Sequence, residues 1–138
     1  MIQEEKDLLL KDLCARLPYG VKVESVFIDL STREHKSCGI EVFRATSLLM
    51  IRDGLGEFKP YLFPLSSMTE EQREELYKMG WYLDGDKIYS CFRNYDDANY
   101  KTHTDCFELI NWCYKNHFDI YGLIPKELAI DATGKNIY

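Results

Sequence analysis

The sequence lacks the patterns that mark membrane and secreted proteins. Its 138 residues contain no apolar run approaching the roughly 18 residues that cross a bilayer. The first stretch, MIQEEKDLLLKDL, has no basic leader and no small-residue cleavage site, and it is more typical of an amphipathic helix than of a signal peptide. The five cysteines are odd in number and form no Cys-x-x-Cys pair, which disfavours a disulfide framework. We therefore expect a cytoplasmic protein with no membrane partner.

An excess of basic residues is also missing. The chain has 17 Lys and Arg against 23 Asp and Glu, for a net charge of −6. This balance disfavours generic binding to nucleic acids, which reward basic surfaces. A mild basic bias in the first third of the chain keeps a nucleic-acid-binding module as an alternative. It comes from Lys11, Arg16, Lys22, Arg33 and Lys36.

Familiar catalytic motifs are absent as well. There is no Gly-rich phosphate loop, Walker lysine, His-Glu-x-x-His helix or EF-hand loop. Ser66 and Ser67 lie in the stretch KPYLFPLSSMTEEQREEL, without the Gly-x-Ser-x-Gly elbow of a nucleophilic serine. The same stretch contains Thr69 and Gln72 at the spacing of a helix capping box. It predicts a hinge between a strand and a helix, and we predict no catalytic residue here.

One set of residues has the types and spacings of zinc ligands, namely His103, Cys106, Cys113 and His117. Cys106 and Cys113 are seven residues apart on one predicted helix, so their backbones are separated by roughly 10 Å. Two sulfurs on one zinc ion, with bonds of about 2.3 Å, must lie within about 4 Å of each other. We therefore expect buried cysteines with no bound metal, and no cofactor.

Clustered carboxylates leave a second alternative, because such groups hold Mg²⁺ or share a proton. A small metal-dependent hydrolase or nuclease would need at least three of five residues to converge in one cleft. These are Asp84, Asp86, Asp96, Asp97 and His103.

The composition, 46% hydrophobic and 29% charged, is typical of one globular domain spanning residues 1–138. Leu10, Leu13, Cys14 and Leu17 predict the buried stripe of a first helix. A change of hydrophobic phase near Glu24 and Ser25 predicts a β-bulge. Prolines 60 and 64 restrict their segment to a sheet edge. The expected elements are a helix at 4–17, strands at 21–30, 39–45 and 47–52, an edge segment at 58–65, a short helix from 70, a hairpin around 84–85 and a helix at 105–117.

These elements predict an α+β fold. We expect an N-terminal helix, a small curved antiparallel sheet of about four or five strands, and two helices packed on that sheet. Such a sheet could curl into a partly open barrel, a shape that often binds peptides or nucleic acids. That argument rests on fold analogy alone.

Three segments carry a resemblance to a known family. They are LLLKDLCARLPYGVKVE, KPYLFPLSSMTEEQREEL and INWCYKNHFDIYGLIPKELAI, which together cover about two-fifths of the chain. In this order they resemble an uncharacterised family of small proteins from gut bacteria, their prophages and other mobile elements. The resemblance implies a mobile-element setting in a bacterium and supplies no functional residue. FRNYDDANYK and the region 31–56 depart from the family pattern, which implies a partner particular to this chain.

The richest signal that remains is aromatic, with 10 Tyr, 7 Phe and 2 Trp. Tyrosine-rich surfaces are typical of protein interfaces, although tyrosines also complete the cores of small domains. We therefore predict a small binding or adaptor protein that acts on a host protein or on another copy of itself. The expected contact regions are the polar loop 31–38 and the aromatic loop 94–101. The residues chosen from them are Arg33, His35, Lys36, Tyr95 and Tyr100.

Overall fold

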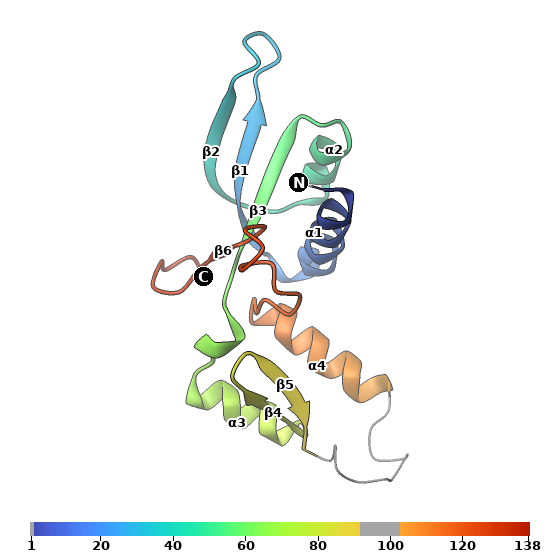
Figure 1. Ribbon diagram of the computed structural model, residues 1–138, viewed down its shortest axis with the longest axis vertical. Coiled ribbons are helices and arrows are strands. Elements are labelled where there is room, and N and C mark those ends of the chain that lie inside the picture. The colour runs from blue at the N-terminus through green and yellow to red at the C-terminus, as the bar shows by residue number, and fades with distance from the viewer. Residues whose placement is uncertain (1, 92–102) are drawn as a thin grey trace.

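The computed structural model describes residues 2–91 and 103–138, and the side chains of 2–91 and 107–138. It has an α+β fold, as predicted, with one group of elements around the larger sheet and a second group around a small hairpin (Figure 1). The helices are α1 (Gln3–Arg16), α2 (Ala45–Arg52), α3 (Glu70–Lys78) and α4 (His103–Lys115), and two 3₁₀ turns span Leu17–Tyr19 and Leu65–Ser67. The strands are β1 (Lys22–Ile28), β2 (His35–Val42), β3 (Gly56–Leu62), β4 (Trp81–Asp84), β5 (Lys87–Ser90) and β6 (Ile130–Asp131).

The larger sheet is mixed, with the strand order β2-β1-β3-β6. β1 pairs antiparallel with both β2 and β3, whereas β6 pairs parallel with β3 over two residues. The sheet does not close into a barrel, so it does not take the partly open barrel shape that the sequence left possible. An open sheet has two edge strands, and the unpaired backbone groups of an edge strand can bind another strand.

The β-bulge predicted near Glu24 and Ser25 is confirmed. Ser25 pairs with Gly39 and Val26 pairs with Ser37, so Cys38 has no partner on β1. Gly39 has a φ of 75°, a backbone conformation that glycine adopts without steric cost. The polar loop predicted at 31–38 is shorter in the structure, because β2 already begins at His35.

The expected strand at 47–52 is wrong, because this segment is the helix α2. Its apolar run is short, and short apolar runs do not distinguish a buried strand from a helix. In the helix, Leu48, Met50 and Ile51 pack on the main core, while Leu49 stays exposed. α2 lies beside α1 (Figure 1), so two helices, and not one, accompany the larger sheet.

The main core lies between α1 and the larger sheet. Its fully buried members include Leu13, Val21, Val23, Leu62 and Leu123. The predicted stripe of α1 is partly wrong, because Leu10 and Cys14 are exposed. The helix instead buries Leu9, Asp12, Leu13 and Arg16, which share one face at helical spacing.

The second group contains α3, the β4–β5 hairpin and α4. These elements share a separate cluster of buried residues. We expected two helices to pack on the larger sheet, but α3 and α4 pack in this second group instead. The cluster consists of Met68, Leu76, Cys113 and Phe118. The predicted capping box is confirmed, because Gln72 N–H donates to Thr69 Oγ1 (3.2 Å) and Thr69 N–H donates to Gln72 Oε1 (2.9 Å). The stretch that contains the two serines is therefore a hinge, as predicted.

The C-terminal segment docks on its own chain. The Tyr138 hydroxyl donates to the Tyr61 carbonyl (2.7 Å) and accepts from the Lys22 N–H (2.9 Å). Ile137 is buried beside Tyr61 and Ala132. None of the helices in the described part of the chain has the length and apolar character that a bilayer crossing requires.

Candidate functional site

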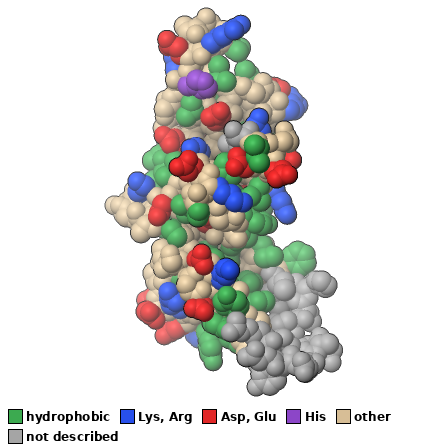
Figure 2. Space-filling view, in the orientation of Figure 1, with side chains coloured by type: hydrophobic (Ala, Val, Ile, Leu, Met, Phe, Trp, Pro, Cys, Tyr) green, Lys and Arg blue, Asp and Glu red, His purple; other side chains and the backbone are tan. Residues whose placement is uncertain are grey.

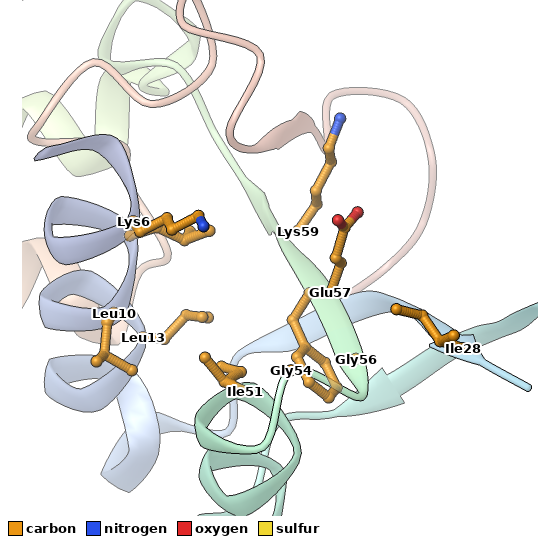
Figure 3. Close-up of a pocket in the computed structure, with 11 residues that line it drawn as sticks. Lys6, Leu10, Leu13, Ile28, Ile51, Gly54, Gly56, Glu57 and Lys59 are labelled. Carbon is orange, nitrogen blue, oxygen red and sulfur yellow. The ribbon is translucent and has the colours of Figure 1, made fainter. Parts of the chain in front are cut away.

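A cavity of about 270 Å³ lies between α1 and β3 (Figure 3). Apolar side chains line most of it, and Leu10, which is 37% exposed, lies on α1 at its mouth. We call this cavity and the adjacent edge of β3 the α1–β3 groove. Its lining residues are Lys6, Leu9, Leu10, Leu13, Ile28, Ile51, Gly54, Gly56, Glu57, Phe58 and Lys59.

No strand of the described residues pairs with the outer edge of β3 over residues 56–60. β6 pairs with this edge only at Tyr61 and Leu62. The paired part of β3 therefore starts one residue after Pro60, which has no N–H to donate. The prediction of an edge segment at 58–65 is therefore confirmed for 58–60 and wrong for 61–62, where β3 lies between β1 and β6. An edge with unpaired backbone groups is a template for another strand.

Two hydrogen bonds establish which backbone groups of β3 point outward. The Ile28 N–H donates to the Leu55 carbonyl (3.0 Å) on the β1 side, and the Ala132 N–H donates to the Leu62 carbonyl (2.8 Å) on the β6 side. Successive residues of a strand direct their N–H and C=O groups to alternate edges. The backbone groups of Gly56 and Phe58 therefore point away from β1, and no strand in the described ranges pairs with them.

Three charged side chains surround the groove. Lys6 extends from α1 toward β3, while Glu57 and Lys59 project together from β3 (Figure 3). All three residues are exposed, and none of them forms an ion pair within residues 2–91 and 107–138. These three groups carry a net positive charge on a protein that is acidic as a whole.

At the opposite edge of the sheet, β2 also has no further strand beside it among the described residues, but it has features that discourage pairing with another strand. The bulge at Cys38 interrupts its regular pairing, and Lys36 places a charge along it. Bulges and edge lysines both discourage the addition of another strand. The segment 56–60 of β3 pairs with β1 in an unbroken register. It is therefore the better template of the two edges.

The predicted contact residues Arg33, His35 and Lys36 lie at the far end of the β1–β2 hairpin. Figure 2 shows basic, acidic and histidine side chains mixed on this protruding end. Asp29 organises the turn by accepting from the Ser31 hydroxyl (2.6 Å) and from Lys36 Nζ (2.9 Å). These two interactions, the serine bond first, lower the pKa of Asp29 to about 2. The hairpin end is exposed as expected, but these three residues do not border the α1–β3 groove, and their binding role stays a prediction.

The other two predicted contact residues, Tyr95 and Tyr100, lie outside the described residues. The same holds for Asp96, Asp97 and the side chain of His103. Asp84 and Asp86 border the turn of the β4–β5 hairpin. No group of three metal-ligating side chains occurs among the described residues, and the convergence that the hydrolase alternative needs stays a prediction.

Four of the five basic residues of the first third make contacts within the chain. Arg16 is fully buried, Lys22 donates to the Ile137 carbonyl (2.7 Å), and Lys36 is paired with Asp29. Lys11 lies over the ring of Tyr121, 5.5 Å from its centroid. Each of these four residues has a partner within the chain, which disfavours the basic surface that a nucleic-acid-binding module requires, and that alternative stays a prediction.

A buried ion pair supports the helix that forms one wall of the groove. Arg16 Nε lies 2.7 Å from Asp12 Oδ2, and both side chains are fully buried. Arg16 also donates to the Phe118 carbonyl (2.6 Å) and stacks over the ring of Tyr114. Burial raises the pKa of Asp12, and the hydrogen bond from Arg16 opposes that shift. Asp12 and Arg16 therefore connect α1 to the segment that follows α4.

Two further candidates for chemistry, the buried Cys113 and the half-buried His117, are engaged in packing. Burial raises the pKa of the Cys113 thiol to about 12, so the thiolate that a nucleophile or a zinc ligand needs is disfavoured. Burial also lowers the pKa of His117 to about 4, and its ring stacks on Tyr138 at a centroid distance of 3.6 Å. Cys113 is therefore part of the second cluster, and the half-buried His117 is engaged in packing against Tyr138.

Sequence reasoning found the edge character of β3 but missed the groove. Pro60 is a local signal, because proline limits strand pairing wherever it occurs. Lys6 and Lys59 carry no such signal, since they border the same cavity only after α1 packs beside β3. Comparison of the chain with protein-family models, with curated proteins and with solved structures found no significant match.

Proposed function

We propose that this chain is a protein-binding module that takes an extended segment of a partner protein as an added strand on β3. The observation that carries the proposal is the free backbone edge at Gly56 and Phe58, which opens into the cavity beside α1. Addition of a strand to a sheet edge supplies affinity through main-chain hydrogen bonds and specificity through pockets for alternate side chains. The groove offers both unpaired main-chain groups and a pocket for a side chain.

The size and lining of the cavity support this mode of binding. At about 270 Å³ it is several times larger than the roughly 30 Å³ that one water molecule occupies in the liquid. A side chain from an added strand that lies opposite Phe58 would point to the same side of the sheet as Phe58. There it would be adjacent to Leu9 and Leu13 of α1 and remove apolar surface from water.

The resemblance to small mobile-element proteins suggests the setting. We propose that the chain acts in a bacterial cytoplasm as an accessory or adaptor factor, and that its partner is a host protein. The resemblance carries no chemistry, so the class of partner rests on the groove alone.

The experiment is selection of peptides from a displayed random library on the wild-type protein, followed by amide hydrogen exchange on the complexes. We expect bound peptides to slow exchange at the amides of Gly56 and Phe58, because these two N–H groups become hydrogen-bonded. A Leu10→Arg variant places a charge at the mouth of the cavity and should lose binding. Leu30→Arg is the matched control, because Leu30 is 75% exposed on the β1–β2 hairpin, away from the groove.

Peptides that bind Leu10→Arg as tightly as wild type, and that leave exchange at Gly56 and Phe58 unchanged, would place the binding surface elsewhere. A library that yields no binder would also contradict the proposal. Urea unfolding of both variants shows whether each retains the stability of the parent.

A further inference from the structure

The charges beside the free edge point to the chemistry of the segment that binds there. This inference rests on the function proposed above. Gly56 and Phe58 alternate with Glu57 and Lys59 along β3, so the two charged side chains lie on the side of the sheet opposite Phe58. They are exposed, while Phe58 is buried in the main core. An added strand would therefore have one side chain near Phe58 and its two neighbours beside Glu57 and Lys59.

Neither charge has an ion-pair partner that it would have to give up. Within the described part of the chain, Glu57 and Lys59 form no salt bridge. On the β1 side, Glu57 pairs with Val26 and Lys59 pairs with Glu24. Lys59 therefore already has one acidic neighbour on β1, and on its other side lies the outer edge of β3, with which no strand of the described residues pairs at this position.

We infer that the groove selects an extended segment in which an apolar residue lies between one acidic and one basic residue. The acidic side chain lies beside Lys59, and the basic side chain lies beside Glu57. Opposite charges on adjacent strands stabilise the pair, and like charges directly opposite destabilise it. The apolar residue between them occupies the cavity that Leu9, Leu10 and Leu13 line.

The order of the two charges in the partner depends on the direction of the added strand. A strand antiparallel to β3 meets Lys59 first and would read acidic, apolar, basic. A strand parallel to β3, the direction that β6 follows at Tyr61 and Leu62, would read basic, apolar, acidic. Two peptides with reversed sequences therefore have the same composition and differ only in the order of the acidic and basic residues.

The test uses two acetylated and amidated peptides, TQTELKTQT and TQTKLETQT. We expect wild type to prefer one of them about fivefold to tenfold, because favourable pairs replace repulsive ones at two positions. A Glu57→Lys, Lys59→Glu double variant should prefer the other peptide by a similar factor. Added salt should reduce both preferences, since exposed charges are screened. The sign of the wild-type preference reports the direction of the added strand.

The controls separate this inference from the function on which it rests. Slower exchange at the Phe58 amide with both peptides, but equal affinities for wild type and the double variant, would overturn the charge order and leave strand addition intact. No binding of either peptide to either protein at millimolar concentration would overturn the charge-ordered ligand, and the library selection then decides on strand addition itself. Because the Lys59→Glu change places a second carboxylate opposite Glu24, the stability of the double variant is measured by urea unfolding before the affinities are compared.

Discussion

Arg16 donates a hydrogen bond of 2.6 Å to the main-chain carbonyl of Phe118, a residue 102 positions later in the chain. The bond joins α1, which is part of the main core, to a residue of the second cluster. Arg16 also holds Asp12 at 2.7 Å, so a single guanidinium serves the groove helix and the segment after α4. We therefore expect the position of α1, and with it the shape of the α1–β3 groove, to depend on this buried group.

Replacement of Arg16 by Met should strongly destabilise the protein. The change leaves Asp12 as an unpaired buried carboxylate and leaves the Phe118 carbonyl without its donor, at an expected cost of about 3–5 kcal/mol. The free energy of unfolding from urea titration measures this cost. An Asp12→Leu, Arg16→Met double variant should recover part of the loss, because no charge then remains buried. A single variant that loses less than about 1 kcal/mol would show that the ion pair does not hold α1 in place.

The same pair explains why the sequence misassigned the face of α1. Hydrophobic periodicity selected Leu10, Leu13, Cys14 and Leu17, because charged residues are almost never fully buried unless paired. The structure buries Asp12 and Arg16 together, which turns the helix so that Leu10 and Cys14 face outward. The partner that makes this burial possible, the Phe118 carbonyl, is too distant in the sequence for a local pattern to reveal it.

Features set by neighbouring residues were predicted well. The Thr69–Gln72 capping box, the turn at Gly85 and the bulge near Ser25 each depend on a few consecutive residues. The open sheet and the groove depend on which strands pair and where α1 packs, and these contacts are non-local. α2 was missed because its eight residues are too few to distinguish helix from strand by periodicity.

Thr69→Ala should reduce stability by about 1 kcal/mol, because it removes the side chain that accepts from the Gln72 N–H at the start of α3. Thermal or urea unfolding measures the change. Ser66→Ala is the matched control, since Ser66 is exposed and lies in the 3₁₀ turn before the helix. Equal losses in the two variants would mean that the cap does not start α3.

Cys113 should resist alkylation in the folded protein. Its thiol is buried, and burial raises its pKa to about 12, so almost no thiolate forms near neutral pH. Cys14 and Cys38 are exposed and should react with iodoacetamide under the same conditions. Mass mapping of alkylated peptides, with and without urea, distinguishes these sites. Labelling of Cys113 at the rate of Cys14 without urea would show that the second cluster opens readily.

His117 should make the protein sensitive to mild acid. Burial first, and then the nearby charges of Arg16 and Lys22, lower the pKa of His117 from 6.5 to about 4. Between these two values the unfolded chain binds a proton at this residue and the folded chain does not. The contribution of His117 to stability is therefore fully present above pH 6.5 and is lost as the pH falls toward 4.

Urea unfolding at neutral pH and near pH 4.5 measures this effect, which we expect to be on the order of 2 kcal/mol. The full pKa shift corresponds to more, but the ring is partly exposed and solvent screens its charge. His117→Asn suits the positive φ of 61° at this position and removes the titrating group. The variant loses the stacking contact with Tyr138 at every pH, so the informative quantity is the difference between the two pH values. That difference should shrink in His117→Asn and stay unchanged in His35→Asn, which alters an exposed histidine; the opposite pattern would assign the acid sensitivity to other groups.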